Sequence, residues 1–125
     1  MILLDTSFLI GAFKPGSPQD ATLRAWLGEG EEIAVSVIAW CEFLCGPIEA
    51  RVVDLVTRIV PRRIGFAGED AELAANLFNR AGRRRGSLTD CMIAATALRL
   101  GASLATEDAS DFRRFEPAGL VVVSM

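Results

Sequence analysis

The chain has 125 residues, 51% of them hydrophobic, and a formal net charge of −3, which predicts one folded domain over residues 1–125. No apolar run approaches the roughly 20 residues of a membrane-spanning helix, no signal-peptide pattern opens the sequence, and three cysteines lack paired spacing, so we expect a soluble cytoplasmic protein. The absence of histidine excludes Ser-His-Asp and Cys-His triads and histidine-ligated zinc, which leaves carboxylates, arginines and hydroxyls for any catalysis.

Short apolar runs alternate along the chain with segments of helical periodicity. The runs at 2–4, 33–35, 103–105 and 120–123 predict buried strands, and 62–66 predicts a short edge strand. Helices are expected over 20–27, 36–45, 49–60, 69–81 and 88–100, with Gly or Pro close behind most of them. This alternation predicts a three-layer α/β/α fold around a mostly parallel, four- to five-stranded sheet.

Four acidic residues fall where a binding site is expected in such a fold. Ligands bind beyond the carboxyl ends of parallel strands. Asp5 and Asp108 follow strands, Asp90 opens a helix that starts at the same edge, and Glu42 lies inside an apolar helix. A carboxylate in apolar surroundings is costly unless it is paired, and converging carboxylates raise one another's pKa. Oxygen ligands favour Mg²⁺ or Mn²⁺, which activates water for attack on a phosphodiester.

Most of these acids also fit a purely structural role. Asp5 is suited to cap a helix starting near Ser7, and Asp90 completes a capping-box pattern three residues after Ser87. Asp108 is likewise suited to cap a short helix. Glu42 alone has no capping role, because it lies within its helix.

A cluster of arginines adds the only strong local positive charge. It consists of Arg80, Arg83, Arg84 and Arg85. The cluster is compatible with contacts to nucleic-acid phosphates, and equally with a solvated helix end that complements the helix dipole.

Four segments together resemble the PIN-domain family, and most closely its VapC-type toxins. Residues 4–10 are similar to the opening motif, with an aspartate after the first strand and a hydroxyl residue behind it. Residues 36–46 resemble the motif of a serine-led helix that carries a glutamate. Residues 90–97 and 104–112 resemble the third and last motifs. The order and spacing of all four motifs agree with the family.

This resemblance implies a Mg²⁺- or Mn²⁺-dependent endoribonuclease that is a homodimer, acts on RNA as the toxin of a toxin–antitoxin pair, and is inhibited by a cognate VapB-like antitoxin. It implies that Asp5 and Asp90 are the principal metal ligands and that Glu42 ligates the metal or orients a metal-bound water. It implies that Asp108 is the fourth acid, a role that Asp111 is close enough to share or take. It implies that Thr6 and Thr106 support the acids through hydrogen bonds. It also implies that Arg84 or Arg85 contacts a phosphate of the substrate.

Other functions are compatible with parts of the pattern. A haloacid-dehalogenase-like phosphatase requires a second acid where Ser7 stands, and a receiver domain requires a late lysine, whereas Lys14 is the only lysine. A housekeeping RNA-processing PIN nuclease and a non-catalytic binding protein on the same fold stay open.

Overall fold

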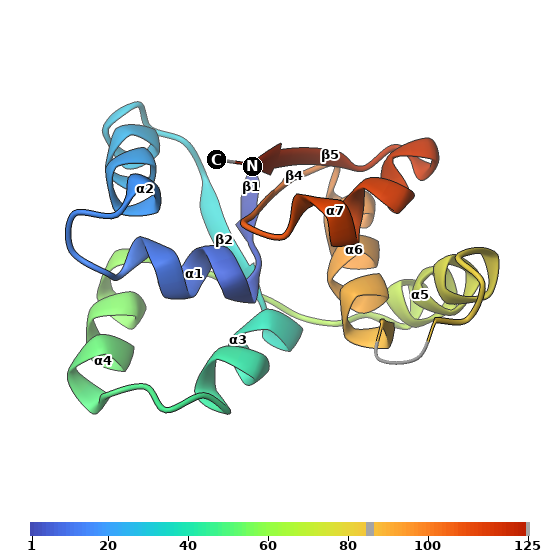
Figure 1. Ribbon diagram of the computed structural model, residues 1–125, viewed down its shortest axis with the longest axis horizontal. Coiled ribbons are helices and arrows are strands. Elements are labelled where there is room, and N and C mark those ends of the chain that lie inside the picture. The colour runs from blue at the N-terminus through green and yellow to red at the C-terminus, as the bar shows by residue number, and fades with distance from the viewer. Residues whose placement is uncertain (85–86, 125) are drawn as a thin grey trace.

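The computed structural model describes residues 1–84 and 87–124 and contains one five-stranded sheet, with strand order β3-β2-β1-β4-β5 and every pair parallel. Helices flank this sheet, with α1, α2 and α4 on one side of Figure 1 and α5, α6 and α7 on the other. The strands are β1 (Ile2–Leu4), β2 (Ile33–Ser36), β3 (Arg63–Ile64), β4 (Ser103–Thr106) and β5 (Val121–Ser124). The helices are α1 (Thr6–Ala12), α2 (Pro18–Gly28), α3 (Val37–Leu44), α4 (Ala50–Ile59), α5 (Gly68–Arg80), α6 (Leu88–Leu100), α7 (Ala109–Phe112) and the 3₁₀ helix η1 (Arg113–Ala118).

The central strands are buried, as the uninterrupted apolar runs predict. Leu4, Ala34 and Leu104 are fully buried within β1, β2 and β4. The register pairs Ile2 with both Ile33 and Ser103, so the carboxyl ends of these three strands lie at the same edge. The chain turns from that edge into α1, α3 and α7. The prediction of a parallel sheet with helices on both faces is confirmed.

Local hydrogen bonds explain where several helices begin. The Ser36 hydroxyl accepts the amide of Ala39 and caps α3, as predicted. Helix α2 begins earlier than predicted, because Ser17 accepts the amide of Asp20 and Pro18 fits the first helical position. Ser87 makes no side-chain cap at α6, since its hydroxyl donates to the Arg84 carbonyl instead. The capping-box interpretation of Asp90 is therefore wrong.

The segment after β4 differs from the single short helix that the sequence suggests. Helix α7 ends at Phe112 and continues as the 3₁₀ helix η1. Phe112 and Phe115 are both buried, with ring centroids 6.3 Å apart. Phe112 ends α7 and Phe115 lies in η1, so the two rings pack together across the junction of the two helices.

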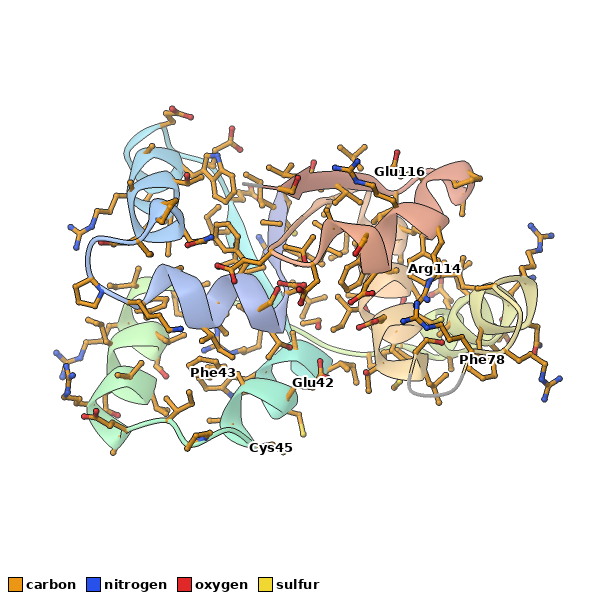
Figure 2. The ribbon with its side chains drawn as sticks, viewed as in Figure 1. Glu42, Phe43, Cys45, Phe78, Arg114 and Glu116 are labelled. Carbon is orange, nitrogen blue, oxygen red and sulfur yellow. The ribbon has the colours of Figure 1, made fainter. Side chains whose placement is uncertain are left out.

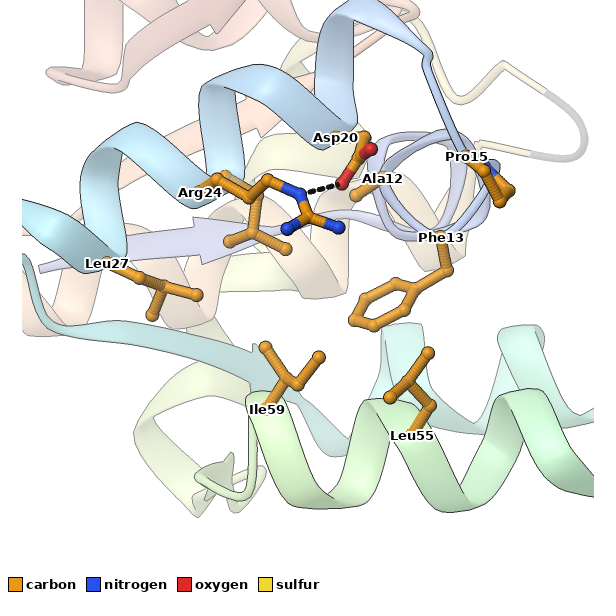
Figure 3. Close-up of a pocket in the computed structure, with 9 residues that line it drawn as sticks. Ala12, Phe13, Pro15, Asp20, Arg24, Leu27, Leu55 and Ile59 are labelled. Carbon is orange, nitrogen blue, oxygen red and sulfur yellow. Dashed lines mark hydrogen bonds and ion pairs between the residues drawn. The ribbon is translucent and has the colours of Figure 1, made fainter.

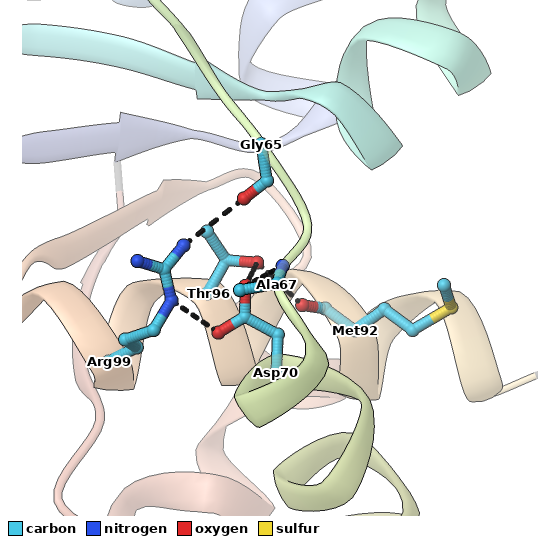
Figure 4. A network of polar contacts seen from close by, with 6 residues as sticks. All are labelled: Gly65, Ala67, Asp70, Met92, Thr96 and Arg99. Carbon is cyan, nitrogen blue, oxygen red and sulfur yellow. Dashed lines mark hydrogen bonds and ion pairs between the residues drawn. The ribbon is translucent and has the colours of Figure 1, made fainter.

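An ion pair between Arg99 and the buried Asp70 holds α5 against α6 (Figure 4). Asp70 is fully buried and accepts from Arg99 Nε at 2.6 Å and from the Ala67 amide at 2.9 Å. Arg99 also donates to the Gly65 carbonyl at 3.1 Å. Burial raises the pKa of Asp70, but the hydrogen bonds from Arg99 and Ala67 lower it by a larger amount. The pKa of Asp70 therefore lies below its usual value. The pair fixes the orientation of α6, whose first turn carries Asp90.

The helices are short compared with a lipid bilayer. The longest that the structure describes, α5 and α6, have 13 residues each. None in the described part of the chain is long and apolar enough to span a membrane.

Candidate active site

A pocket of about 240 Å³ lies at the carboxyl edge of the sheet and collects the acids predicted from the sequence. Its polar lining consists of Asp5, Thr6, Ser7, Glu42, Asp90, Asp108 and Asp111. Its apolar lining consists of Ile10, Ile93 and Phe112. Residues from four distant segments of the chain thus meet in one place, as the strand-end argument predicts.

Asp5 lies at the centre of this edge, between β1 and α1. Its amide donates to the Ala105 carbonyl of β4 at 3.0 Å. Its Oδ1 accepts the Phe8 amide at 2.8 Å and the Ser7 hydroxyl at 2.9 Å, so Asp5 does cap α1. Burial raises the pKa of Asp5 to about 6, although hydrogen bonds from Thr106, Phe8 and Ser7 oppose this effect. The carboxylate is therefore held in place but remains short of compensating positive charge.

Glu42 faces the same pocket from α3 (Figure 2). It is half-buried, and its Oε1 accepts the Thr6 hydroxyl at 2.9 Å. The same hydroxyl lies 3.4 Å from the Ala39 carbonyl, which ties the start of α1 to α3. Thr6 is thus a direct hydrogen-bond partner of Glu42, and the supporting role that the resemblance implies for it stays a prediction.

Asp90 is the acid of this pocket on whose pKa the largest number of other acids act. Its pKa is raised to about 6, chiefly by burial and then by the negative charge of Asp111. The charges of Glu42 and Asp108 raise it further, while Arg114 lowers it. The acids thus lie close enough for their negative charges to act on one another across the pocket.

One hydroxyl and two acids lie on the β4 side of the pocket. Thr106 accepts the Asp108 amide at 2.9 Å, and its hydrogen bond lowers the pKa of Asp5. Asp108 stands at the start of α7 without a side-chain cap, so its carboxylate is not used there. The charge of Asp108 also raises the pKa of Asp5. Among the neighbouring acids, Asp111 raises the pKa of Asp90 the most.

Sequence reasoning gave no role to Ser7, although its position two residues after Asp5 could have indicated one. Its hydroxyl donates to Asp5, accepts the Glu107 amide at 3.1 Å and lies 3.4 Å from the Thr106 hydroxyl. Serine and threonine commonly bond to nearby backbone and side chains at helix starts. Ser7 therefore links the first and last motifs.

The arginines are placed less uniformly. Arg84 lies beside the pocket, with Nη2 4.0 Å from Asp111 Oδ1, and both side chains are substantially exposed. Arg85 lies outside the described residues. Arg114, which the sequence did not single out, has Nη2 3.8 Å from Asp90 Oδ2.

The donor chemistry of the pocket suits a hard divalent cation. Within residues 1–84 and 87–124, no group of three or more Asp, Glu, Cys or His side chains already has an arrangement that would hold a metal ion. Mg²⁺ commonly takes only one or two carboxylates and keeps several waters, so a compact cage is not required. The buried Asp5 and the half-buried Asp90, both with raised pKa values, fit such a cation, because its charge would relieve the repulsion.

A PIN domain family model matches residues 2–116 of the chain. The chain belongs to the PIN domain family. A solved structure similar to this PIN domain is that of VapBC2 from Rickettsia felis bound to a promoter DNA fragment, with a TM-score of 0.79 and 20% identity over 100% of this chain and 99% of that one. A toxin–antitoxin complex from Klebsiella pneumoniae has a TM-score of 0.75 and 26% identity, covering 99% and 97%. VapC20 from Mycobacterium tuberculosis, titled a sarcin-ricin loop cleaving toxin, has a TM-score of 0.69 and 20% identity, covering 100% of both chains.

A search of curated protein sequences finds no match. The family match confirms the PIN resemblance and, with the observed sheet, the three-layer fold. The roles of the individual site residues in this PIN domain stay predictions.

Proposed function

We propose that this PIN domain is a metal-dependent endoribonuclease that acts as the toxin of a toxin–antitoxin pair. The observation that carries the proposal is the convergence on one pocket of acids from four segments of the chain, two of which have pKa values raised to about 6. Structures similar to the chain include toxin–antitoxin complexes and a toxin that cleaves an RNA loop, which supports this activity. Cleavage of RNA and three free cysteines both suit the cytoplasm.

Each acid in the pocket has a distinct role in this proposal. Asp5 and Asp90 would hold the ion, and Asp108 would complete the negative cluster, with Asp111 able to share that position. Mg²⁺ or Mn²⁺, when bound, supplies positive charge for the phosphodiester and lowers the pKa of water. Glu42, whose Oε1 accepts the Thr6 hydroxyl, would ligate the metal or orient the attacking water.

The rim of the pocket supplies charge for the substrate. Arg84 is exposed and lies at the edge of the acidic pocket, so it is placed to contact a phosphate of the bound strand. The same role is proposed for Arg85. Single-stranded loops are the expected RNA targets, because their bases and backbone are accessible to side chains.

An apolar groove offers a surface for the antitoxin (Figure 3). It has a volume of about 350 Å³ and lies between α2 and α4, next to the end of α1. Leu27, Leu55 and Ile59 line it and are each more than a third exposed. An ion pair of 2.8 Å between Arg24 and Asp20 borders the groove. Exposed apolar side chains gathered in a groove are typical of sites for the apolar face of a partner helix, the contact that we propose for a VapB-like antitoxin.

Cleavage of RNA by the purified protein tests the enzymatic part. We expect cleavage with Mg²⁺ or Mn²⁺, loss of cleavage in excess EDTA, and loss in the Asp5→Asn and Asp90→Asn variants. Asp54→Asn is a matched control, because Asp54 is an exposed acid on α4 away from the pocket. Equal cleavage in EDTA and by the Asp5 and Asp90 variants would overturn the metal-dependent mechanism.

Growth after induced expression tests the toxin role. We expect arrest with the wild type, and relief both by Asp5→Asn and by co-expression of a small neighbouring gene. Metal-dependent cleavage without growth arrest would instead indicate a housekeeping RNA-processing enzyme. The expected homodimer stays a prediction that the mass of the purified protein in solution can test.

A further inference from the structure

A second pocket lies beside the acidic one, on the far side of Arg114. It has a volume of about 330 Å³ and is formed by the end of α5 and by η1. Leu77, Ala81, Phe115 and Pro117 give it apolar walls, and Arg80 and Arg114 give it positive charge. Arg114 also reaches Asp90 of the acidic pocket at 3.8 Å, so this side chain separates the two pockets. Figure 2 shows Arg114 extending toward the region where α5 and α6 meet.

The charge of Arg114 is only partly compensated. Its Nε and Nη2 atoms are buried and have no hydrogen-bond partner among the described residues. Its guanidinium lies 4.6 Å from the centre of the Phe115 ring, which fixes the orientation of the group. Arginine usually satisfies a carboxylate through two parallel hydrogen bonds, and the contact to Asp90 at 3.8 Å is too long for one. Buried donors without partners are costly, and their persistence points to a ligand or a functional state in which the group is better satisfied.

We infer that Arg114 and this second pocket bind a nucleotide of the RNA strand adjacent to the cleaved bond, with the phosphate on Arg114. The inference rests on the proposed function. A cation held by Asp90 would neutralise the charge of that carboxylate. Asp90 would then no longer balance the charge of Arg114, and the guanidinium would be available to bind an anion. The apolar walls suit the sugar and base of a single-stranded nucleotide, and Arg80 adds a second positive charge at the opening.

A binding measurement separates this role from that of a mere counter-ion for Asp90. The protein carries Asp5→Asn so that the RNA stays intact in Mg²⁺. Binding of a fluorescein-labelled single-stranded RNA of about 12 nucleotides is followed by anisotropy between about 50 and 200 mM KCl, because each phosphate contact contributes about 0.7 to the salt slope. Arg113→Gln is the matched control, since Arg113 is the exposed neighbour and its replacement removes the same charge.

We expect Arg114→Gln to weaken binding about tenfold or more and to lower the salt slope by about 0.7. Arg114→Lys should bind RNA more weakly but keep the same salt slope. The ammonium group still neutralises the phosphate, but it lacks the paired, planar N–H donors of the guanidinium. Ala81→Phe, which fills the pocket without changing charge, should also weaken binding. If Arg114→Gln fails to fold, as judged by thermal unfolding, Arg114→Lys and Ala81→Phe together carry the test.

Unchanged binding by Ala81→Phe, or a salt slope for Arg114→Gln equal to that of Arg113→Gln, would overturn the inference. In that case the parent protein still binds RNA and the wild type still cleaves it, so the proposed function stands. Failure of the parent to bind RNA, with no cleavage by the wild type, would instead remove the proposed function and this inference with it.

Discussion

Replacing Asp5 by asparagine should abolish RNA cleavage and, at the same time, stabilise the metal-free protein. Moving the pKa of Asp5 from 3.8 to about 6 corresponds to about 3 kcal/mol of free energy that disfavours the ionised native state at neutral pH. Asparagine has no charge, yet its oxygen can still accept from the Phe8 amide and the Ser7 hydroxyl. Its new amide hydrogens need partners, so we expect a net gain of about 1–3 kcal/mol in the free energy of unfolding.

The raised pKa of Asp5 also fixes the sign of the pH dependence of stability. A carboxyl whose pKa is higher in the folded state binds more protons folded than unfolded between pH 3.8 and about 6. The free energy of unfolding of the wild type should therefore rise as the pH falls through this window. Asp90 has a similarly raised pKa, so Asp5→Asn should keep part of this slope and lose the remainder.

Urea unfolding in EDTA at pH 7 and pH 5 measures both effects, and unchanged m-values would show that the unfolded states are comparable. Asp54→Asn serves as the control, because Asp54 is an exposed acid. Added Mg²⁺ should stabilise the wild type more than Asp5→Asn. A loss of about 1 kcal/mol or more for Asp5→Asn at pH 7 in EDTA would refute the reasoning, since the charged cap would then outweigh the cost of burial.

Three further predictions concern other parts of the molecule. Glu42→Gln should lower the cleavage rate about 100-fold or more while RNA binding persists, and Thr6→Val should lower it about 10- to 100-fold, as single-turnover kinetics would show. Asp70→Asn should lower the free energy of unfolding in urea, because Arg99 loses its counter-charge although its hydrogen bond to the Gly65 carbonyl remains; an unchanged or higher value would contradict this. Leu55→Glu should abolish binding of the neighbouring small protein in calorimetry without changing RNA cleavage, whereas Leu44→Glu, at an exposed leucine outside the groove, should bind normally.

The sequence predicts the sheet well because the signal for a buried parallel strand is local. Residues 103–106 are a short run in which three positions are buried, and Gly101 ends the preceding helix with a left-handed backbone. Helix starts are also legible where one side chain makes the cap, as at Ser36. Given parallel strands, the meeting of Asp5 and Asp108 at one edge follows from topology alone.

Features that depend on pairs distant in the sequence were not predictable in the same way. Asp70 and Arg99 form their ion pair 29 positions apart, and neither stands out among the other charged residues of its helix. Arg113 and Arg114 are adjacent and chemically identical, yet only Arg114 is packed on Phe115 and directed to Asp90. Which of two neighbouring arginines turns inward is decided by the winding of η1, which the sequence pattern did not indicate.

Capping and metal binding are compatible roles for Asp5, and two further acids of the pocket lie at helix starts without capping them. Asp5 caps α1 through Oδ1, Asp90 lies in the first turn of α6, and Asp108 stands at the start of α7. Helix N-termini favour negative charge, which reduces the cost of gathering acids there. The raised pKa values of Asp5 and Asp90 show that this compensation is incomplete. The partial positive charge of the helix N-termini does not fully neutralise these acids. The negative charge that remains is one that a divalent cation would balance.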